Sequence, residues 1–197
     1  MSELDPHYFL LQVLRNIYPL SDEEWEWIKP KFRPVSFRKK ERIIDTEMIS
    51  GSYVFIARGL ARLYGYKEGA EKTLFFFKEG MLAGSIQSYL FQKPSLLVLE
   101  ALEEIDGLEI SKDDLETVFQ SSPAMAQILM TYTQLRLNSL LHFFSSFVLD
   151  SPEERYEKFM LNEPGLINRV PQHIIASFLG ITPVSLSRIR KRLLDKR

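Results

Sequence analysis

The sequence predicts an α+β protein in which a small β-barrel or jelly roll is followed by one long helix and then by an all-helical domain. Three observations predict this order. Short runs of β-branched and aromatic residues, separated by glycine-containing turns, fill residues 35–110. No glycine or proline stands between Pro123 and Pro152, which allows a helix of up to about 27 residues. Residues 166–197 have helical spacing.

Composition narrows the class of protein. The chain has 197 residues, of which 45% are hydrophobic and 26% charged, as in ordinary globular proteins. It contains no cysteine, which excludes a disulfide scaffold, a thiol nucleophile and a cysteine-ligated zinc or iron–sulfur site. No apolar run approaches the roughly 18–20 residues of a membrane helix, and the acidic start is unlike a secretory signal. We therefore expect a cytoplasmic protein with no membrane partner.

Two short helices are expected before the strands. Residues 5–30 are helical by pattern, and Pro19 divides them. Ser21 and Glu24 have the spacing of a capping box, which starts the second helix, and Pro30 ends it.

The middle of the chain is typical of several short strands. Glu68-Gly69 followed by Ala70 has the composition of a hairpin tip. The run Phe75-Phe76-Phe77 is expected to serve the core and an interface. The expected strands are residues 42–45, 53–57, 61–66, 72–77, 96–101 and 108–110.

The long helix carries more apolar surface than a barrel edge can cover. Ser111 and Ser122-Pro123 have the pattern of helix N-termini before it, and Ser151 with Glu154 forms a capping box after it. Because an exposed apolar stripe is a liability in a monomer, we expect the helix to pair with a second copy of the chain. The alternative is a helix packed wholly within its own chain. The residues expected at the dimer contact are Leu129, Tyr132, Leu140, Phe143 and Phe144.

A two-helix motif lies at the C-terminus. Residues 171–179 form a short helix, Gly180 permits a tight turn, and Thr182-Pro183 caps a second helix that runs to about residue 194. Two short helices joined by a glycine-containing turn, the second one basic, are typical of a DNA-binding helix-turn-helix. The residues expected to hold the two helices together are Ile175, Ala176, Leu179, Ile181, Leu186 and Ile189.

Helical geometry identifies the exposed face of the second helix. With Leu186 and Ile189 toward the core, the opposite face holds Val184, Ser187, Arg188 and Lys191. Arg188 is expected to contact a guanine edge, Val184 a thymine methyl group, and Ser187 a base or a phosphate. The alternative is a basic helix that is only solvated. The residues expected to contact the DNA backbone are Thr182, Lys191, Arg192 and Lys196.

Charge is divided unevenly along the chain, although its formal net charge is only -1. Residues 1–150 hold 16 basic and 21 acidic side chains, whereas residues 166–197 hold seven basic side chains and one acidic. A basic C-terminal segment favours a nucleic-acid partner.

Signals of catalysis are weak. No two of the three histidines have metal-ligand spacing, and no P-loop, G-x-S-x-G or G-x-G-x-x-G motif is present. We expect no enzyme, no catalytic residue, no metal site and no resident cofactor.

Several stretches resemble the Crp/Fnr family of bacterial transcription regulators, in the branch common in Bacteroidetes. They are residues 19–25 (PLSDEEW), 53–64 (YVFIARG and ARLY) and 169–191 (RVPQ, IASFLGITP and SLSRIRK). The resemblance implies an N-terminal domain of the cyclic-nucleotide-binding fold. It also implies a homodimer that places the second helix of each motif in successive major grooves of a two-fold DNA site.

The chain departs from the family where a cyclic nucleotide is bound. The family carries Gly-Glu for the ribose, and Arg followed by Ser or Thr for the cyclic phosphate. The matching residues are Gly84, Ser85, Pro94 and Ser95. Since Pro94 cannot replace a bidentate arginine, cyclic AMP is not expected in the usual mode. These four residues remain the candidate effector pocket, which either takes another ligand or is filled by side chains.

The expected organisation has three parts. Residues 1–121 form the sensor domain, residues 122–149 the dimerisation helix and residues 150–197 the helix-turn-helix domain, whose wing is short or absent. The expected partners are double-stranded DNA and a second copy of the chain, with RNA polymerase and an unknown small-molecule effector as further candidates. The alternative function is a ligand-sensing or protein-interaction module of the same fold that does not bind DNA.

Overall fold

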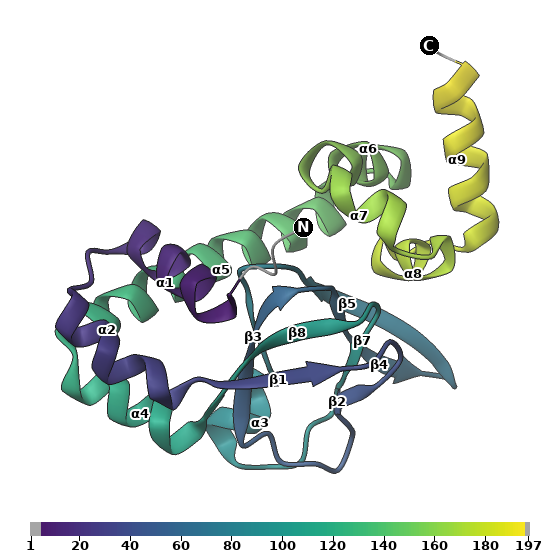
Figure 1. Cartoon of the computed structure of the whole chain (residues 1–197). Helices are drawn as coiled ribbons and strands as arrows, with labels where there is room; N and C mark the ends of the chain where they lie inside the picture. Colours follow the sequence, from purple (N-terminus) through teal and green to yellow (C-terminus); the bar gives the residue numbers. More distant parts are fainter. Residues whose placement is uncertain (1–4, 196–197) are drawn as a thin grey trace. The chain divides into compact units, whose positions relative to one another are not determined.

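The computed structural model describes residues 5–195 (Figure 1). These residues divide into two compact units. The first unit takes the chain up to Leu63 together with Phe76–Leu135, and the second takes Tyr64–Phe75 together with the chain from Arg136 onward. The longest helix, α5 (Pro123–Leu149), has the 27 residues that the sequence predicts, and it contributes to both units.

The chain begins with α1 (Pro6–Ile17), α2 (Asp22–Ile28) and a 3-10 turn, η1 (Lys29–Lys31). The predicted capping box of α2 is present, because Ser21 and Glu24 exchange side chain-to-backbone hydrogen bonds. Glu24 also accepts a hydrogen bond of 2.7 Å from Ser122 Oγ, directly before α5. This hydrogen bond and those from Ser21 lower the pKa of Glu24 below its usual range, so the carboxylate stays charged and ties α2 to the start of α5.

The described strands form two four-stranded sheets of antiparallel pairs, consistent with the predicted jelly roll. Pro34 explains why the sequence pattern missed the strand at residues 33–37. It lies in an edge strand, the position that a sheet allows to a residue without an N–H group. One sheet has the order β1 (Arg33–Phe37), β8 (Ile105–Ser111), β3 (Ser52–Arg58), β6 (Leu82–Ala83). The other has the order β2 (Arg42–Ile44), β7 (Val98–Ala101), β4 (Ala61–Lys67), β5 (Ala70–Phe77).

The predicted hairpin tip is confirmed between β4 and β5. Glu68 and Gly69 both have positive φ, of 54° and 74°. Two central residues of this kind make the two-residue turn that matches the twist of an antiparallel pair.

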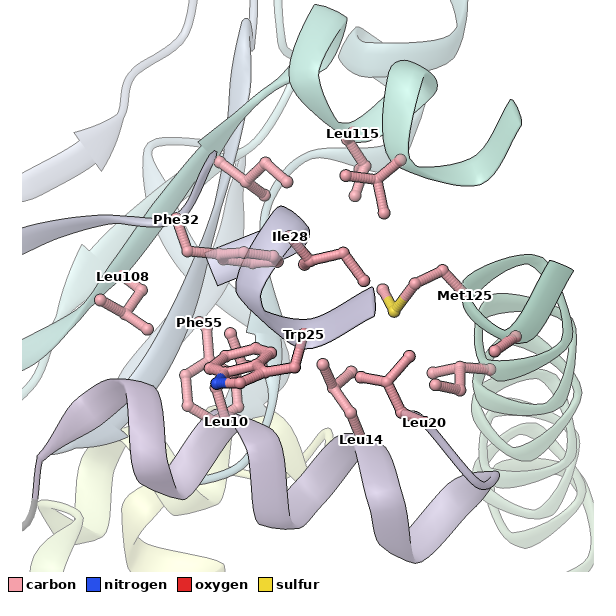
Figure 2. Close-up of a cluster of buried hydrophobic side chains, with 14 residues drawn as sticks. Leu10, Leu14, Leu20, Trp25, Ile28, Phe32, Phe55, Leu108, Leu115 and Met125 are labelled. Carbon is pink, nitrogen blue, oxygen red and sulfur yellow. The ribbon is translucent and has the colours of Figure 1, made fainter. Parts of the chain in front are cut away.

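The core of the first unit lies between one sheet and four helices. Phe55, Leu108 and Ile110 of the sheet pack under α1, α2, the first turns of α5, and α4 (Lys112–Ser121). Figure 2 shows Trp25 and Phe32 between α1 and the sheet, with Met125 reaching in from α5.

Five further helices complete the fold, and Ser85 caps the one that the sequence did not predict, α3 (Ile86–Phe91). The predicted capping box of Ser151 and Glu154 is present, and it opens the first of the four described helices that follow α5. These are α6 (Pro152–Asn162), α7 (Pro164–Arg169), α8 (Gln172–Phe178) and α9 (Pro183–Asp195). Over residues 5–195, no helix is both long and apolar enough to cross a bilayer.

Candidate nucleic-acid interface

The turn between α8 and α9 is built by backbone hydrogen bonds around Gly180. The N–H of Ile181 donates to the carbonyl of Ala176 at 3.0 Å, and the N–H of Gly180 donates to that of Ser177 at 3.1 Å. These two bonds define a Schellman motif, whose C′ residue must be left-handed. Gly180 has a φ of +69°, so it ends α8 as predicted.

Thr182 begins the second helix of the motif. Its Oγ1 accepts a hydrogen bond of 3.1 Å from the N–H of Ser185, and Pro183 follows as the first helical residue. The hydroxyl satisfies one of the N–H groups that a helix start leaves without a partner. The N-cap that the sequence predicts is therefore present.

Apolar side chains fix the angle between α8 and α9. Ala176 is fully buried, and its small side chain allows the two helices to approach closely. Of the predicted contact residues, Ile181 alone is only half-buried. The buried set is Ile174, Ile175, Ala176, Leu179, Leu186 and Ile189.

An aromatic cluster packs against α8, the first helix of the motif. Phe178 of α8 stacks on Phe143 of α5 at 4.7 Å between ring centroids and lies 5.6 Å from Phe159 of α6. Arg155 joins the same elements, because its Nε donates to the carbonyl of Leu179 and its guanidinium lies over the ring of Phe147. Arg155 escaped the sequence reasoning, since no local pattern marks an arginine that reaches a backbone carbonyl 24 residues away.

The predicted contact face of α9 is exposed. Val184 has 61% of its surface accessible, and Ser187, Arg188 and Lys191 are also exposed. These four side chains are therefore accessible to a groove of DNA. Arg188 has the donor geometry for a guanine edge.

The residues expected to contact phosphate have different surroundings. Thr182 and Lys191 are exposed. Arg192 is exposed as well but forms an ion pair of 3.0 Å with Glu153 of α6, which ties α9 to α6. Lys196 lies outside the described residues.

The hairpin of β4 and β5 meets α8 within the second unit. The N–H of Thr73 donates to Ser177 Oγ at 3.0 Å, and Ser177 Oγ donates to the carbonyl of Glu71 at 3.1 Å. Nothing in the sequence singles out Ser177, because a serine inside a short helix has no distinctive pattern. The hairpin thus holds the first helix of the motif by backbone atoms.

Three of the four candidate effector-pocket residues lie close together in the first unit. Ser85 and Ser95 are buried and their Oγ atoms are 3.1 Å apart. Gly84 precedes Ser85 and packs against the ring of Tyr53, so that a Cβ there would lie 2.3 Å from Tyr53 Cδ1. Pro94 is exposed.

The five residues expected at the dimer contact have different surroundings along α5. Leu129 and Tyr132 line an apolar cavity of about 60 Å³ in the first unit, and Tyr132 Oη accepts a hydrogen bond from the N–H of Leu82. Phe143 belongs to the aromatic cluster. Leu140 and Phe144 are exposed.

A metal site is not evident in the part of the chain that the structure describes. Residues 5–195 contain no group of three or more His, Asp or Glu side chains placed to hold one ion.

Comparisons with known proteins agree with this geometry at the level of fold. No family model and no curated protein matches the chain. FixK2 from Bradyrhizobium japonicum matches with a TM-score of 0.72 and 18% identity, over 84% of this chain and 85% of that one. CLP from Xanthomonas campestris, a c-di-GMP-responsive global regulator, matches with 0.70 and 17%, over 89% and 93%. A protein from Eubacterium rectale described as a Crp/Fnr-family transcriptional regulator matches with 0.69 and 17%, over 92% and 88%.

These likenesses extend over most of each chain. The chain therefore has the fold of Crp/Fnr regulators, with a domain of the cyclic-nucleotide-binding type followed by a helix-turn-helix. The α+β fold class and the resemblance stated from the sequence are confirmed as a likeness of fold. The Bacteroidetes branch stays a prediction.

Proposed function

We propose that the chain is a sequence-specific DNA-binding transcription regulator of the Crp/Fnr type that acts as a homodimer. The observation that carries this proposal is the capped helix-turn-helix whose second helix exposes Val184, Ser187, Arg188 and Lys191. A helix of this kind fits the major groove with its N-terminal residues at the base edges.

The proposed contacts follow from side-chain chemistry. Arg188 pairs with a guanine, Val184 packs against a thymine methyl group, and Ser187 contacts a base or a phosphate. Thr182 and Lys191 contact the backbone. Arg192 must exchange its ion pair with Glu153 for a phosphate to do the same, so its contribution to affinity is smaller than that of Lys191.

The experiment that tests the proposal is DNA binding by the full chain as a function of salt. Duplexes are first selected from a random library, and binding is then measured by fluorescence anisotropy for a selected and a random duplex. Contacts to roughly 6–10 phosphates would lower the affinity by about 10³–10⁵ between 50 and 200 mM salt. An absence of binding at every salt concentration would refute the proposal and favour a module that binds no DNA.

Two variants separate reading of sequence from attraction to phosphate. Arg188→Ala should cost about 1–3 kcal/mol of discrimination between the selected and the random duplex, with little loss on random DNA. Lys191→Ala should weaken both complexes alike and reduce the salt slope by about 1 per protomer. Arg38→Ala, an exposed arginine before β2, is the matched control. Exchanged effects of the first two variants would mean that the roles are reversed.

The proposed dimer contact is an exposed seam on α5. Leu137, Leu141, Phe144 and Val148 recur at intervals of four, three and four residues, and each is more than half exposed. This is the spacing by which two helices interlock in a coiled coil. Phe144 is among the residues expected at the contact from the sequence, and Leu137, Leu141 and Val148 are added to that set here.

The proposed function does not include the usual contacts to cyclic AMP. Ser85 stands in place of the acid for the ribose, and Pro94 in place of the arginine for the phosphate. RNA polymerase and a small-molecule effector remain proposed partners, and the candidate pocket for the effector is Gly84, Ser85, Pro94 and Ser95.

A further inference from the structure

The segment 84–97 (the cassette), which includes α3, is held at its start by an aromatic contact. Tyr53 of β3 lies over Gly84, so close that a Cβ at Gly84 would meet the ring at 2.3 Å. The same ring packs on Tyr89 of α3 at 4.8 Å between centroids. Burial of the Tyr53 hydroxyl raises its pKa well above the usual range.

Hydrogen bonds among serines hold the end of the cassette to its beginning. Ser95 Oγ lies 3.1 Å from Ser85 Oγ and 2.7 Å from the carbonyl of Leu97, and it accepts a hydrogen bond from the N–H of Leu97. Ser85 Oγ also accepts from the N–H of Ser88. Both serines are at most 4% exposed.

The middle of the cassette is fixed to the loop between β2 and β3. Ser88 Oγ accepts a hydrogen bond of 2.8 Å from the N–H of Ser50 and donates one of 2.7 Å to the carbonyl of Lys93. The N–H of Ser95 donates to the carbonyl of Met48 at 2.9 Å. Ser88 is 1% exposed, so these bonds are shielded from water.

The network satisfies the buried hydroxyl groups of the cassette. Among the described residues, every buried side-chain oxygen of the cassette has a hydrogen-bond partner within the chain. A nucleotide would therefore have to break these bonds to make its own. The cassette contains one basic residue, Lys93, which is exposed, so the buried serines are joined by no positive charge from the cassette itself.

We infer that the serine network closes the cassette in place of a cyclic nucleotide, and that the chain binds DNA without one. The second half of the inference rests on the proposed function, whereas the first half does not. Where a nucleotide would supply the bonds that order this segment, Ser85, Ser88 and Ser95 supply them here.

The first test uses the unmodified chain and three probes: cyclic AMP, cyclic GMP and cyclic di-GMP. None should shift the melting temperature at concentrations up to millimolar, because a ligand that binds the folded state raises it. Affinity for the selected duplex should be the same with and without each probe. A saturable rise in melting temperature, or DNA binding that requires a probe, would overturn the inference.

A variant tests the network itself. Ser95→Ala removes the hydroxyl that joins Ser85 to the backbone of Leu97, so amide hydrogen exchange across residues 84–97 should become roughly tenfold faster. Ser121→Ala, at the exposed end of α4, is the matched control and should change nothing. Unchanged exchange in Ser95→Ala would contradict the closed network.

The outcomes also separate the inference from the proposed function. A chain that binds no duplex, with or without a nucleotide, contradicts the proposed function and the nucleotide-independent DNA binding together. The melting and exchange measurements still decide whether the cassette is closed. If Ser95→Ala does not fold, the three probes on the unmodified chain decide it.

Discussion

Gly180 meets two conditions that an amino acid with a side chain could not meet at this position. Its φ of +69° lies in the left-handed region, which costs a residue with a side chain roughly 1–2 kcal/mol. A Cβ at this position would also lie 2.8 Å from Cε1 of Phe147, inside van der Waals contact. The turn of the motif and the aromatic cluster therefore depend on the same missing side chain.

Gly180→Ala should lower the free energy of unfolding by about 2 kcal/mol, the sum of left-handed strain and a displaced aromatic ring. The measurement is thermal or urea unfolding followed by circular dichroism. Gly165→Ala is the matched control, because a Cβ in that helix meets no atom within 4 Å and alanine favours helix. Equal losses in the two variants would show that the turn is not strained by a side chain.

Asp150 joins the end of α5 to α6. Its carboxylate accepts hydrogen bonds from Lys158 Nζ at 2.7 Å and from Ser146 Oγ, while its carbonyl accepts one from Arg155. The hydrogen bond from Lys158, followed by that from Ser146, lowers the pKa of the carboxyl group. Because the folded-state pKa is the lower one, the charged form stabilises the fold above the ordinary carboxyl range, and this stabilisation is lost as the pH falls through the folded-state pKa.

Asp150→Asn should therefore lower the melting temperature at neutral pH. The difference from the unmodified chain should shrink toward zero as the pH falls below 3.8, the ordinary pKa of an aspartate. The measurement is calorimetry over a pH series at constant ionic strength. Glu157→Gln neutralises an exposed carboxylate of α6 and serves as the control. A difference between Asp150→Asn and the unmodified chain that persists in acid would mean that charge is not the cause.

At the scale of the element, α5 shows what a sequence pattern can and cannot decide. Its length and both its ends follow from Pro123, Pro152 and the serines before them. Its contact faces do not, because apolar residues lie all round the helix and periodicity then marks no single stripe. Tyr132 and Phe143, both expected at the dimer contact, also make contacts within their own units.

The strands show the same division. Strands β2 to β5, β7 and β8 were predicted within a few residues. The helix α3 and the edge strands β1 and β6 were not predicted, because α3 and β6 are only six and two residues long and Pro34 interrupts the strand pattern of β1. The helix-turn-helix was predicted from local signals, whereas its supports from Arg155 and Ser177 depend on residues far away in the sequence.

Leu141→Asp should disrupt the proposed dimer, because it places a charge in the middle of the exposed seam. The dimer should weaken by roughly 30-fold or more, the effect of a 2 kcal/mol hot spot. The measurement is sedimentation equilibrium of the full chain. Leu161→Asp changes an exposed leucine of α6 and is the matched control. An unmodified chain that sediments as a monomer would contradict the dimer, and a dimer unaffected by Leu141→Asp would place the contact elsewhere.

At the scale of the whole molecule, the near-zero net charge is the sum of a long acidic stretch and a shorter basic one. Residues 1–150 carry a formal charge of -5 (16 basic and 21 acidic side chains) and residues 151–197 a charge of +4 (nine and five), so the total of -1 describes neither stretch. Total charge is therefore a poor guide to nucleic-acid binding for a chain of two units, and the distribution of charge along the chain is the better one.

The contact of Ser177 with the β4–β5 hairpin determines which segments a chimera of such proteins must exchange together. The compact unit that contains the helix-turn-helix is assembled from two separate stretches of the chain, Tyr64–Phe75 and the residues from Arg136 onward. A chimera made by exchanging only the C-terminal stretch would pair α8 with a foreign hairpin and lose the two bonds to Glu71 and Thr73. In this fold the unit of modular exchange is discontinuous, and a graft that keeps the motif intact must carry the hairpin with it.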